Sequence, residues 1–194
     1  MDSTKMKLQM NFSQLVLQQN RLIFDKYNLH VIEQDDNYIK LLSKKLQFII
    51  VHNKRENSNT FFIGRKDKND VVEIDNDLLE RFFQSKLELS EVSIDVFLRN
   101  LEAFFENEAK PLLTDDLNFI TQLEKFDLER SNEYTLNLLM RQKLIAADDA
   151  WSQSNYKEFI NLIDQINNED IPASYLLKYK IANQRLRNDI GDRW

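Results

Sequence analysis

Glycine is nearly absent from this chain, since Gly64 and Gly191 are the only two glycines among 194 residues. Loops that cradle phosphates need glycine, because backbone amides must come close to the ligand and the chain must reach positive φ. Neither a G-x-G-x-x-G pattern nor a Walker loop can be written in this sequence. The composition therefore disfavours a nucleotide enzyme of the usual designs and favours a largely helical protein.

The length and composition suit a soluble globular protein with one domain or two small interlocked ones. Hydrophobic residues make up 42% of the chain, enough for a sizeable core, but runs such as residues 46–51 are far shorter than a membrane span of roughly 20 residues. The stretch after Lys5 and Lys7 is rich in Gln and Asn, unlike a signal peptide. Cysteine is absent, which excludes disulfides and thiolate metal sites. We expect a cytoplasmic protein that does not bind membranes.

The first part of the chain predicts one helix followed by a small antiparallel sheet. Apolar residues at helical spacing predict a helix over residues 11–27, with Asn11 or Ser13 as its N-cap. Short β-branched and aromatic runs separated by polar turns then predict a meander of four or five strands between Leu29 and Ile74.

Only helices are expected after Ile74. The expected N-caps of the first four are Asp75 or Asn76, Ser93, Thr114 and Ser131. Pro111 is expected to end the second of these helices, and the fourth is expected to run to about Trp151. A shorter helix and a last one starting at Pro172 follow. Strands followed by helices predict an α+β fold, with residues 1–74 and 75–194 sharing one core because no flexible linker divides them.

Charge is spread unevenly along the chain. Residues 1–74 hold 12 basic and 9 acidic side chains, a net charge of +3, whereas residues 75–194 hold 14 and 23, a net charge of −9. The acidic helical part disfavours nucleic acid and favours a basic protein partner. The sheet region is basic, with clusters at residues 44–45, 54–55 and 65–68, but acidic residues dilute each cluster and the nearby phenylalanines suit a core. We therefore predict a protein partner and no nucleic acid.

The candidate partner-binding residues lie in an acidic segment, residues 88–116, which holds eight acidic residues against Arg99 and Lys110. Those expected to form an acidic stripe are Glu91, Asp95, Glu102 and Glu106. Glu102 and Glu106 are four residues apart and share a helix face, where like charges cost a few tenths of a kcal/mol. Such a stripe is either plain solvated surface or a docking surface for a basic partner.

No catalytic, cofactor-binding or metal-binding residues are predicted. His30 and His52 lack the partners and spacing of a metal site. The adjacent pairs at residues 35–36, 115–116 and 148–149 are acidic, but neighbouring helical side chains point about 100° apart and do not converge on one atom. Asp115 and Asp116 are explained as residues of a helix's first turn, where the helix dipole favours anions.

A helical hairpin is expected near Trp151. Residues 146–159 read AADDAWSQSNYKEF. Small residues let two helices approach, an aromatic residue fills the cleft, and the Asn155-Tyr156 pair closes the turn. This segment resembles the middle of a tetratricopeptide-type hairpin, although that family usually has glycine where Asn155 stands and alanine where Phe159 stands. Only one copy is present, whereas an array needs about three. The resemblance therefore implies a packing device rather than a peptide-binding array.

The same segment, continued by residues 160–164 and by PASYLLKYKIA at 172–182, is similar to the C-terminal part of bacterial immunity proteins encoded beside polymorphic toxins. This resemblance implies a non-enzymatic cytoplasmic protein that neutralises a toxin domain, often through an acidic surface. The toxin-contacting residues of the family vary too widely to be carried over. Two other functions fit the sequence: an adaptor or structural protein with another partner, and an undescribed carboxylate-dependent enzyme.

Overall fold

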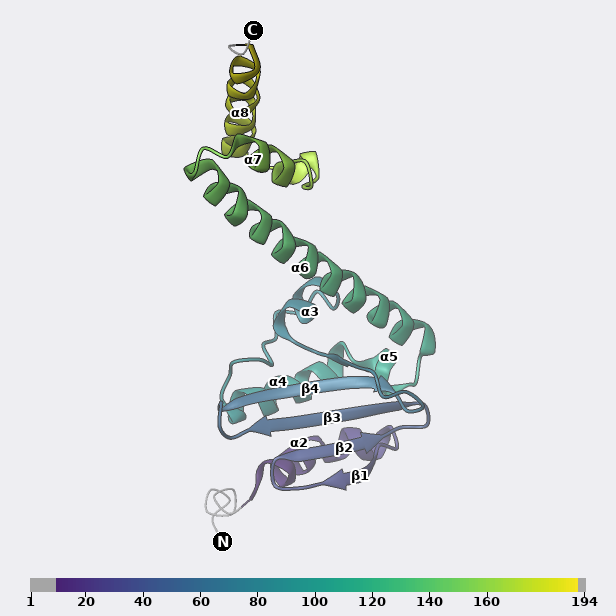
Figure 1. The fold of residues 1–194 in the computed structure, drawn as a ribbon. Helices are drawn as coiled ribbons and strands as arrows, with labels where there is room; N and C mark the ends of the chain where they lie inside the picture. Colours follow the sequence, from purple (N-terminus) through teal and green to yellow (C-terminus); the bar gives the residue numbers. More distant parts are fainter. Residues whose placement is uncertain (1–9, 192–194) are drawn as a thin grey trace. The chain divides into compact units, whose positions relative to one another are not determined.

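The computed structural model describes residues 10–191 and has the predicted α+β fold (Figure 1). An N-terminal helix precedes a five-stranded sheet, and helices follow. The helices are α2 (Phe12–Lys26), α3 (Asn76–Arg81), α4 (Ile94–Asn107), α5 (Lys110–Leu113), α6 (Leu117–Ser152), α7 (Tyr156–Ile163), the short 3-10 helix η1 (Asn168–Asp170) and α8 (Ala173–Gly191). The strands are β1 (His30–Gln34), β2 (Tyr38–Leu42), β3 (Leu46–Asn53), β4 (Ser58–Arg65) and β5 (Val71–Glu73). The described residues do not include 1–9, which contain Lys5 and Lys7, or 192–194. The predicted regions 1–74 and 75–194 therefore each extend beyond them.

A capping box starts α2 where the sequence predicted a helix. The Asn11 side chain accepts a hydrogen bond from the Gln14 backbone amide at 2.9 Å, and the Gln14 side chain accepts one from the Asn11 amide at 3.1 Å. These two bonds satisfy amides that the first turn of a helix leaves without partners. Asn11 is therefore the N-cap, and Ser13 instead donates its hydroxyl to the Asn11 side chain. The helix buries its apolar side, including Val16 and Phe24.

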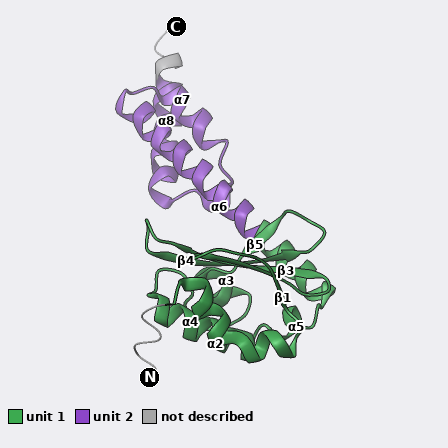
Figure 2. Ribbon diagram, turned by 90° about the horizontal axis from the view of Figure 1, so that it is seen from below, with its two compact units in different colours: residues 1–128 green, residues 129–194 purple. Residues whose placement is uncertain are grey.

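The sheet is an antiparallel meander in the order β1-β2-β3-β4-β5, which confirms the predicted topology. Helices α2 and α4 lie on the same side of it (Figure 2). In β2, β3 and β4 the strand side chains that point to that side alternate with those that point away, and the large apolar ones are buried. They include Ile39, Leu41, Phe48, Ile50, Phe61 and Ile63. On α4, Phe105 packs edge-on against Phe61 with ring centroids 5.5 Å apart and against Phe48 at 6.4 Å.

The chain divides into two compact units at residues 128 and 129 (Figure 2), whereas the sequence suggested a division after residue 74. The difference arises because α3, α4, α5 and the start of α6 bury apolar side chains in the same core as the sheet. Leu79, Leu101, Leu112 and Leu123 belong to that core. The second unit has its own core, built from α6, α7 and α8 around Phe159.

A single long helix, α6, replaces the two helices predicted to start at Thr114 and Ser131. Residues 117–152 contain neither proline nor glycine, so nothing in the backbone ends a helix near Ser131. The Ser131 carbonyl instead accepts the Thr135 hydroxyl at 2.9 Å inside the helix. Asp116 caps the start, because its side chain accepts the amides of residues 118 and 119.

Pro111 and Thr114 also have roles at helix ends that differ from the prediction. Helix α4 ends at Asn107, and Pro111 lies in the first turn of the short helix α5 rather than ending α4. Proline fits there because the first-turn amides of a helix have no intrahelical acceptor. Thr114 follows α5 and donates its hydroxyl back to the carbonyl of Lys110 at 2.9 Å. The side chain of Thr114 is therefore used by the preceding helix and not by α6.

Gly64 should be intolerant of even one added carbon. It lies opposite Gln47 and Val71 in the sheet, and a Cβ at this position would approach the Asp70 carbonyl oxygen to 2.5 Å. Because that oxygen belongs to the backbone of the β4–β5 turn, Gly64→Ala must displace the turn. We expect a loss of about 1–3 kcal/mol in the free energy of unfolding, measured by urea denaturation.

Thr60→Ala is the matched control, since Thr60 lies four residues earlier on the same side of β4 and is half-buried. It should cost less than about 1 kcal/mol, the span of strand propensities. Equal losses for the two variants would show that the turn moves away from an added methyl group without strain.

Candidate partner-binding surfaces

The predicted acidic stripe is only partly formed. Asp95, Glu102 and Glu106 lie on α4, but Glu91 precedes the helix in a loop, where its backbone has a φ of 61°. Glu102 is half-buried and accepts a hydrogen bond from the Gln19 side chain on α2, while the other three acids are exposed. Arg99 shares their helix face, because residues 95, 99, 102 and 106 follow helical spacing. Partner binding by these four acids stays a prediction.

The paired aspartates at residues 115–116 serve different structural purposes. Asp116 caps α6, as expected of a first-turn acid. Asp115 adopts a φ of 58° and turns toward the β2–β3 turn. Its carboxylate accepts the Ser43 hydroxyl at 2.5 Å and the Lys45 amide at 3.1 Å. The prediction that helix capping explains both residues is therefore wrong for Asp115, which connects two parts of unit 1.

The aspartates at residues 35–36 stabilise the turn between β1 and β2. Asp35 accepts the Asn37 amide at 2.7 Å, and Asp36 accepts the Asn11 side-chain amide at 2.8 Å. The second bond joins this turn to the start of α2. Both carboxylates therefore have a structural role in the geometry observed.

The two histidines lie in different surroundings. His52 is buried on the helix-covered side of the sheet, where its Nδ1 lies 3.0 Å from the Asn59 side-chain oxygen and its ring lies 5.3 Å from Phe12. His30 is exposed at the start of β1. Across residues 10–191, no group of three or more His, Asp or Glu side chains is arranged to hold a metal ion.

A helical hairpin forms around Trp151, at the position where the sequence predicted one. Asn155 caps α7 by accepting the Glu158 amide at 3.3 Å. The buried residues Ala147 and Ala150 lie on α6. Trp151 is half-buried rather than fully enclosed, and its ring packs edge-on against Phe159 at 5.2 Å and Tyr156 at 5.4 Å.

Truncating Trp151 should destabilise unit 2. Its core is small, so losing the contacts with Tyr156 and Phe159 removes a large share of its aromatic packing. We expect Trp151→Ala to cost about 3 kcal/mol, near the low end for a buried tryptophan because this ring is partly exposed. Circular dichroism during thermal melting measures the effect, and Leu177→Ala at an exposed position of α8 is the control. Unchanged melting of Trp151→Ala would show that the ring adds nothing to the hairpin.

Asp148 joins α6 to α8 through two charge-assisted contacts. Its carboxylate accepts the Lys178 ammonium at 2.6 Å and the Tyr175 hydroxyl at 2.5 Å. These two hydrogen bonds lower the pKa of Asp148, and the bond from Lys178 has the larger effect. Burial, followed by the hydrogen bond to Asp148, raises the pKa of Tyr175 from its ordinary 10.0 to about 12. Asp149, which follows on α6, is exposed.

Tyr175 should ionise at unusually high pH. Because its folded-state pKa is raised, its contribution to stability is complete below pH 10.0 and is lost as pH rises toward about 12. Tyrosinate absorbance of the wild type minus that of Tyr175→Phe isolates this titration. Asp148→Asn should lower the Tyr175 midpoint, because it removes the carboxylate that holds the phenol proton. A Tyr175 midpoint at the ordinary value, unchanged by Asp148→Asn, would contradict the contact.

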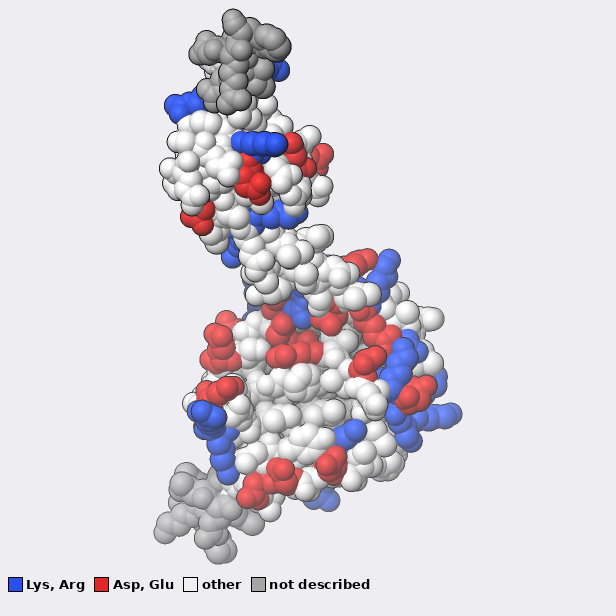
Figure 3. Space-filling model, viewed as in Figure 1, with Lys and Arg blue, Asp and Glu red and all other residues white. Residues whose placement is uncertain are grey.

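The side of the sheet away from α2 and α4 is apolar at its centre, a feature that the sequence reasoning missed. We call it the open face; its apolar members are Tyr38, Leu42, Ile49, Val51, Phe62 and Val71, all half-buried. In Figure 3, which views the sheet from this side, mostly uncharged side chains lie over the strands and charged ones lie along the margins. The signal in the sequence was the run of consecutive apolar residues 48–51 in β3, which is typical of a strand with two apolar sides.

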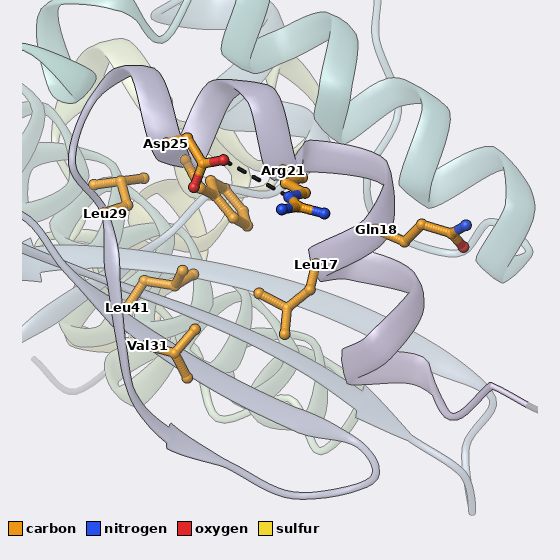
Figure 4. Close-up of a pocket in the computed structure, with 8 residues that line it drawn as sticks. Leu17, Gln18, Arg21, Asp25, Leu29, Val31 and Leu41 are labelled. Atoms are coloured by element: carbon orange, nitrogen blue, oxygen red, sulfur yellow. Dashed lines mark ion pairs between the residues drawn. The ribbon is translucent and has the colours of Figure 1, made fainter.

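A groove lies on the other side of the sheet, between α2 and strands β1 and β2 (Figure 4). It has a volume of about 410 Å³, and its apolar lining includes Leu17, Leu29 and Leu41. Arg21 and Asp25 form an ion pair at 3.7 Å on its α2 side. The groove is a second apolar feature of unit 1, next to the edge strand β1.

Unit 2 also carries exposed apolar side chains. Tyr134, Leu138 and Ile145 lie on one side of α6 and are 71%, 45% and 65% exposed. Their spacing of four and seven residues places them along a single stripe of the helix. This stripe is narrower than the open face of the sheet, because it belongs to one helix.

No family model, curated protein or solved structure matches the chain. None of the helices within residues 10–191 has both the length and the apolar composition needed to cross a lipid bilayer.

Proposed function

We propose that this chain binds another protein without acting as an enzyme, and that its partner is a toxin domain which it neutralises. The open face of the sheet carries the first part of this proposal. The resemblance of residues 146–164 and 172–182 to immunity proteins suggests the second part.

The open face has the composition of an interaction surface. An antiparallel sheet with one covered side normally presents polar residues on the other. Here one row across the sheet runs Glu33, Lys40, Ile49, Phe62, Glu73, so two large apolar residues stand between charged ones. An apolar centre inside a polar rim is the usual arrangement of a protein-binding site. Within residues 10–128, the helices that cover the sheet contribute to the core on the opposite side.

The acidic residues of α4 form a separate surface, because α4 packs against the other side of the sheet (Figure 2). Asp95 and Glu106 are exposed there and suit a basic partner. A partner domain that covers the open face would not reach α4 at the same time without wrapping around an edge of the sheet. The two surfaces can therefore be tested independently.

A growth assay tests the proposal. The C-terminal domain of any large secreted protein encoded beside the gene for this chain is expressed in bacteria with and without the chain. We expect the chain to restore growth. Ile49→Thr/Phe62→Thr should abolish the rescue, because each side chain at the centre of an interface contributes about 2 kcal/mol, roughly thirtyfold in Kd. Threonine retains strand propensity, so the fold should persist, which circular dichroism checks.

Leu22→Gln is the matched control, since Leu22 is an apolar residue of α2 that is 83% exposed and lies away from the open face. It should rescue growth as well as the wild type does. Two more variants, Asp95→Lys/Glu106→Lys and Tyr134→Gln/Leu138→Gln, test the α4 acids and the α6 stripe. If either loses rescue while Ile49→Thr/Phe62→Thr keeps it, the open face is not the binding surface.

The two parts of the proposal can fail separately. If no toxin domain is encoded nearby, or if the chain fails to restore growth, neutralisation is wrong. Binding of a non-toxic protein that Ile49→Thr/Phe62→Thr loses and Leu22→Gln keeps would then identify an adaptor. If Ile49→Thr/Phe62→Thr weakens the binding of no partner, the binding proposal itself is contradicted.

A further inference from the structure

A basic hollow lies at one end of the sheet, where the β2–β3 turn meets the β4–β5 turn. Its volume is about 420 Å³. The hollow is lined by Lys44, Lys45, Arg65, Lys66, Asp67 and Leu117. Four positively charged side chains thus surround the space against one carboxylate, in a chain whose net charge is −6. The concentration of positive charge is therefore local and runs against the balance of the whole molecule.

Hydrogen bonds hold the two turns that carry these lysines. The Asp115 carboxylate binds the Ser43 hydroxyl and the Lys45 amide in the first turn. In the second turn, the buried side chain of Gln47 donates to the carbonyls of Arg65 at 3.0 Å and Lys68 at 2.7 Å. The backbone positions of the lysines are therefore set by contacts made within the fold.

A further bond joins the two turns directly. The Lys66 amide donates to the Lys45 carbonyl at 2.8 Å. Lys44, Lys45 and Lys66 consequently emerge from one connected piece of backbone. A ligand that binds all three would not need to order the turns first, which reduces the entropy lost on binding.

Arg65 contributes less free charge than the lysines. Its Nε donates to Glu124 at 2.9 Å, and its Nη2 donates to Glu124 at 3.1 Å and to Thr121 at 2.7 Å. These contacts compensate much of its charge and hold the guanidinium against α6. The three lysines are therefore the groups available to a ligand. All three are exposed, and each offers a point charge rather than a planar fork.

We propose that the basic hollow binds a compact polyanion carrying two or more phosphate groups. Lysine binds phosphate as a point charge, and several lysines together favour a ligand with several negative charges. None of the six lining residues is aromatic, so the lining offers no surface on which a nucleobase would stack. Leu117 is the only apolar residue in the lining, which disfavours a lipid chain. The site does not depend on the proposed function.

Calorimetric titration with inorganic pyrophosphate at low salt tests the site. The wild type should show saturable binding to one site that weakens as salt is added, because the interaction is between charges near the surface. Lys44→Gln/Lys66→Gln should weaken binding about tenfold or more. Neither change touches the backbone bonds that hold the turns, so the fold should be unaffected, which urea denaturation checks.

The chain offers a matched control in Lys54→Gln/Arg55→Gln. Both residues are exposed in the β3–β4 turn at the opposite end of the sheet, and the variant removes the same charge. Its affinity for pyrophosphate should fall less than about twofold, the effect of net charge alone. Equal weakening by the two double variants, or no saturable binding by the wild type, would overturn the site. Equally tight binding of citrate would show that the hollow recognises charge alone and would overturn the assignment to phosphate.

Discussion

The packing of α4 against one side of the sheet is the interaction on which the rest of unit 1 depends. Phe104 and Phe105 project from adjacent positions of α4, and both meet Phe61 of β4 at ring-centroid distances of 6.1 and 5.5 Å. Together with α2, this helix removes one apolar side of each central strand from water. Because both helices use the same side, neither of them covers the other side of the sheet, and the open face is the direct result.

One turn of the sheet shapes both proposed sites. The β4–β5 turn folds over Gly64, where only a residue without Cβ leaves room for the Asp70 carbonyl. Gln47, opposite Gly64, binds the carbonyls at the two ends of the same turn. The turn thereby limits the open face at one end and places Lys66 beside the β2–β3 turn. Although the chain has only two glycines, Gly64 occupies a position where the close approach of another backbone segment requires glycine.

The sequence signals that succeeded depend on near neighbours along the chain. The N-caps at Asn11 and Asp75, and the short β-branched and aromatic runs of β2 to β4, involve residues that are close together in the sequence. The signals that failed are those for which the residue has a second possible role, and the surrounding or distant structure decides between the two roles. Ser131 has the chemistry of an N-cap, but a helix already running through it needs no new start. Asp115 resembles a capping acid, but its partner Ser43 is 72 residues away.

The sequence by itself determined the α+β class, the N-terminal helix, the meander and the helical character of the rest, because hydrophobic period and turn chemistry are local properties. Only the tertiary structure decided which side of each strand and helix meets solvent. Glu102 and Glu106 share a helix face in the sequence, yet α2 brings Gln19 to Glu102 and leaves Glu106 exposed. Exposure depends on how distant segments pack, so the open face and the basic hollow, assembled from residues of several strands and turns, could be found only in the folded chain.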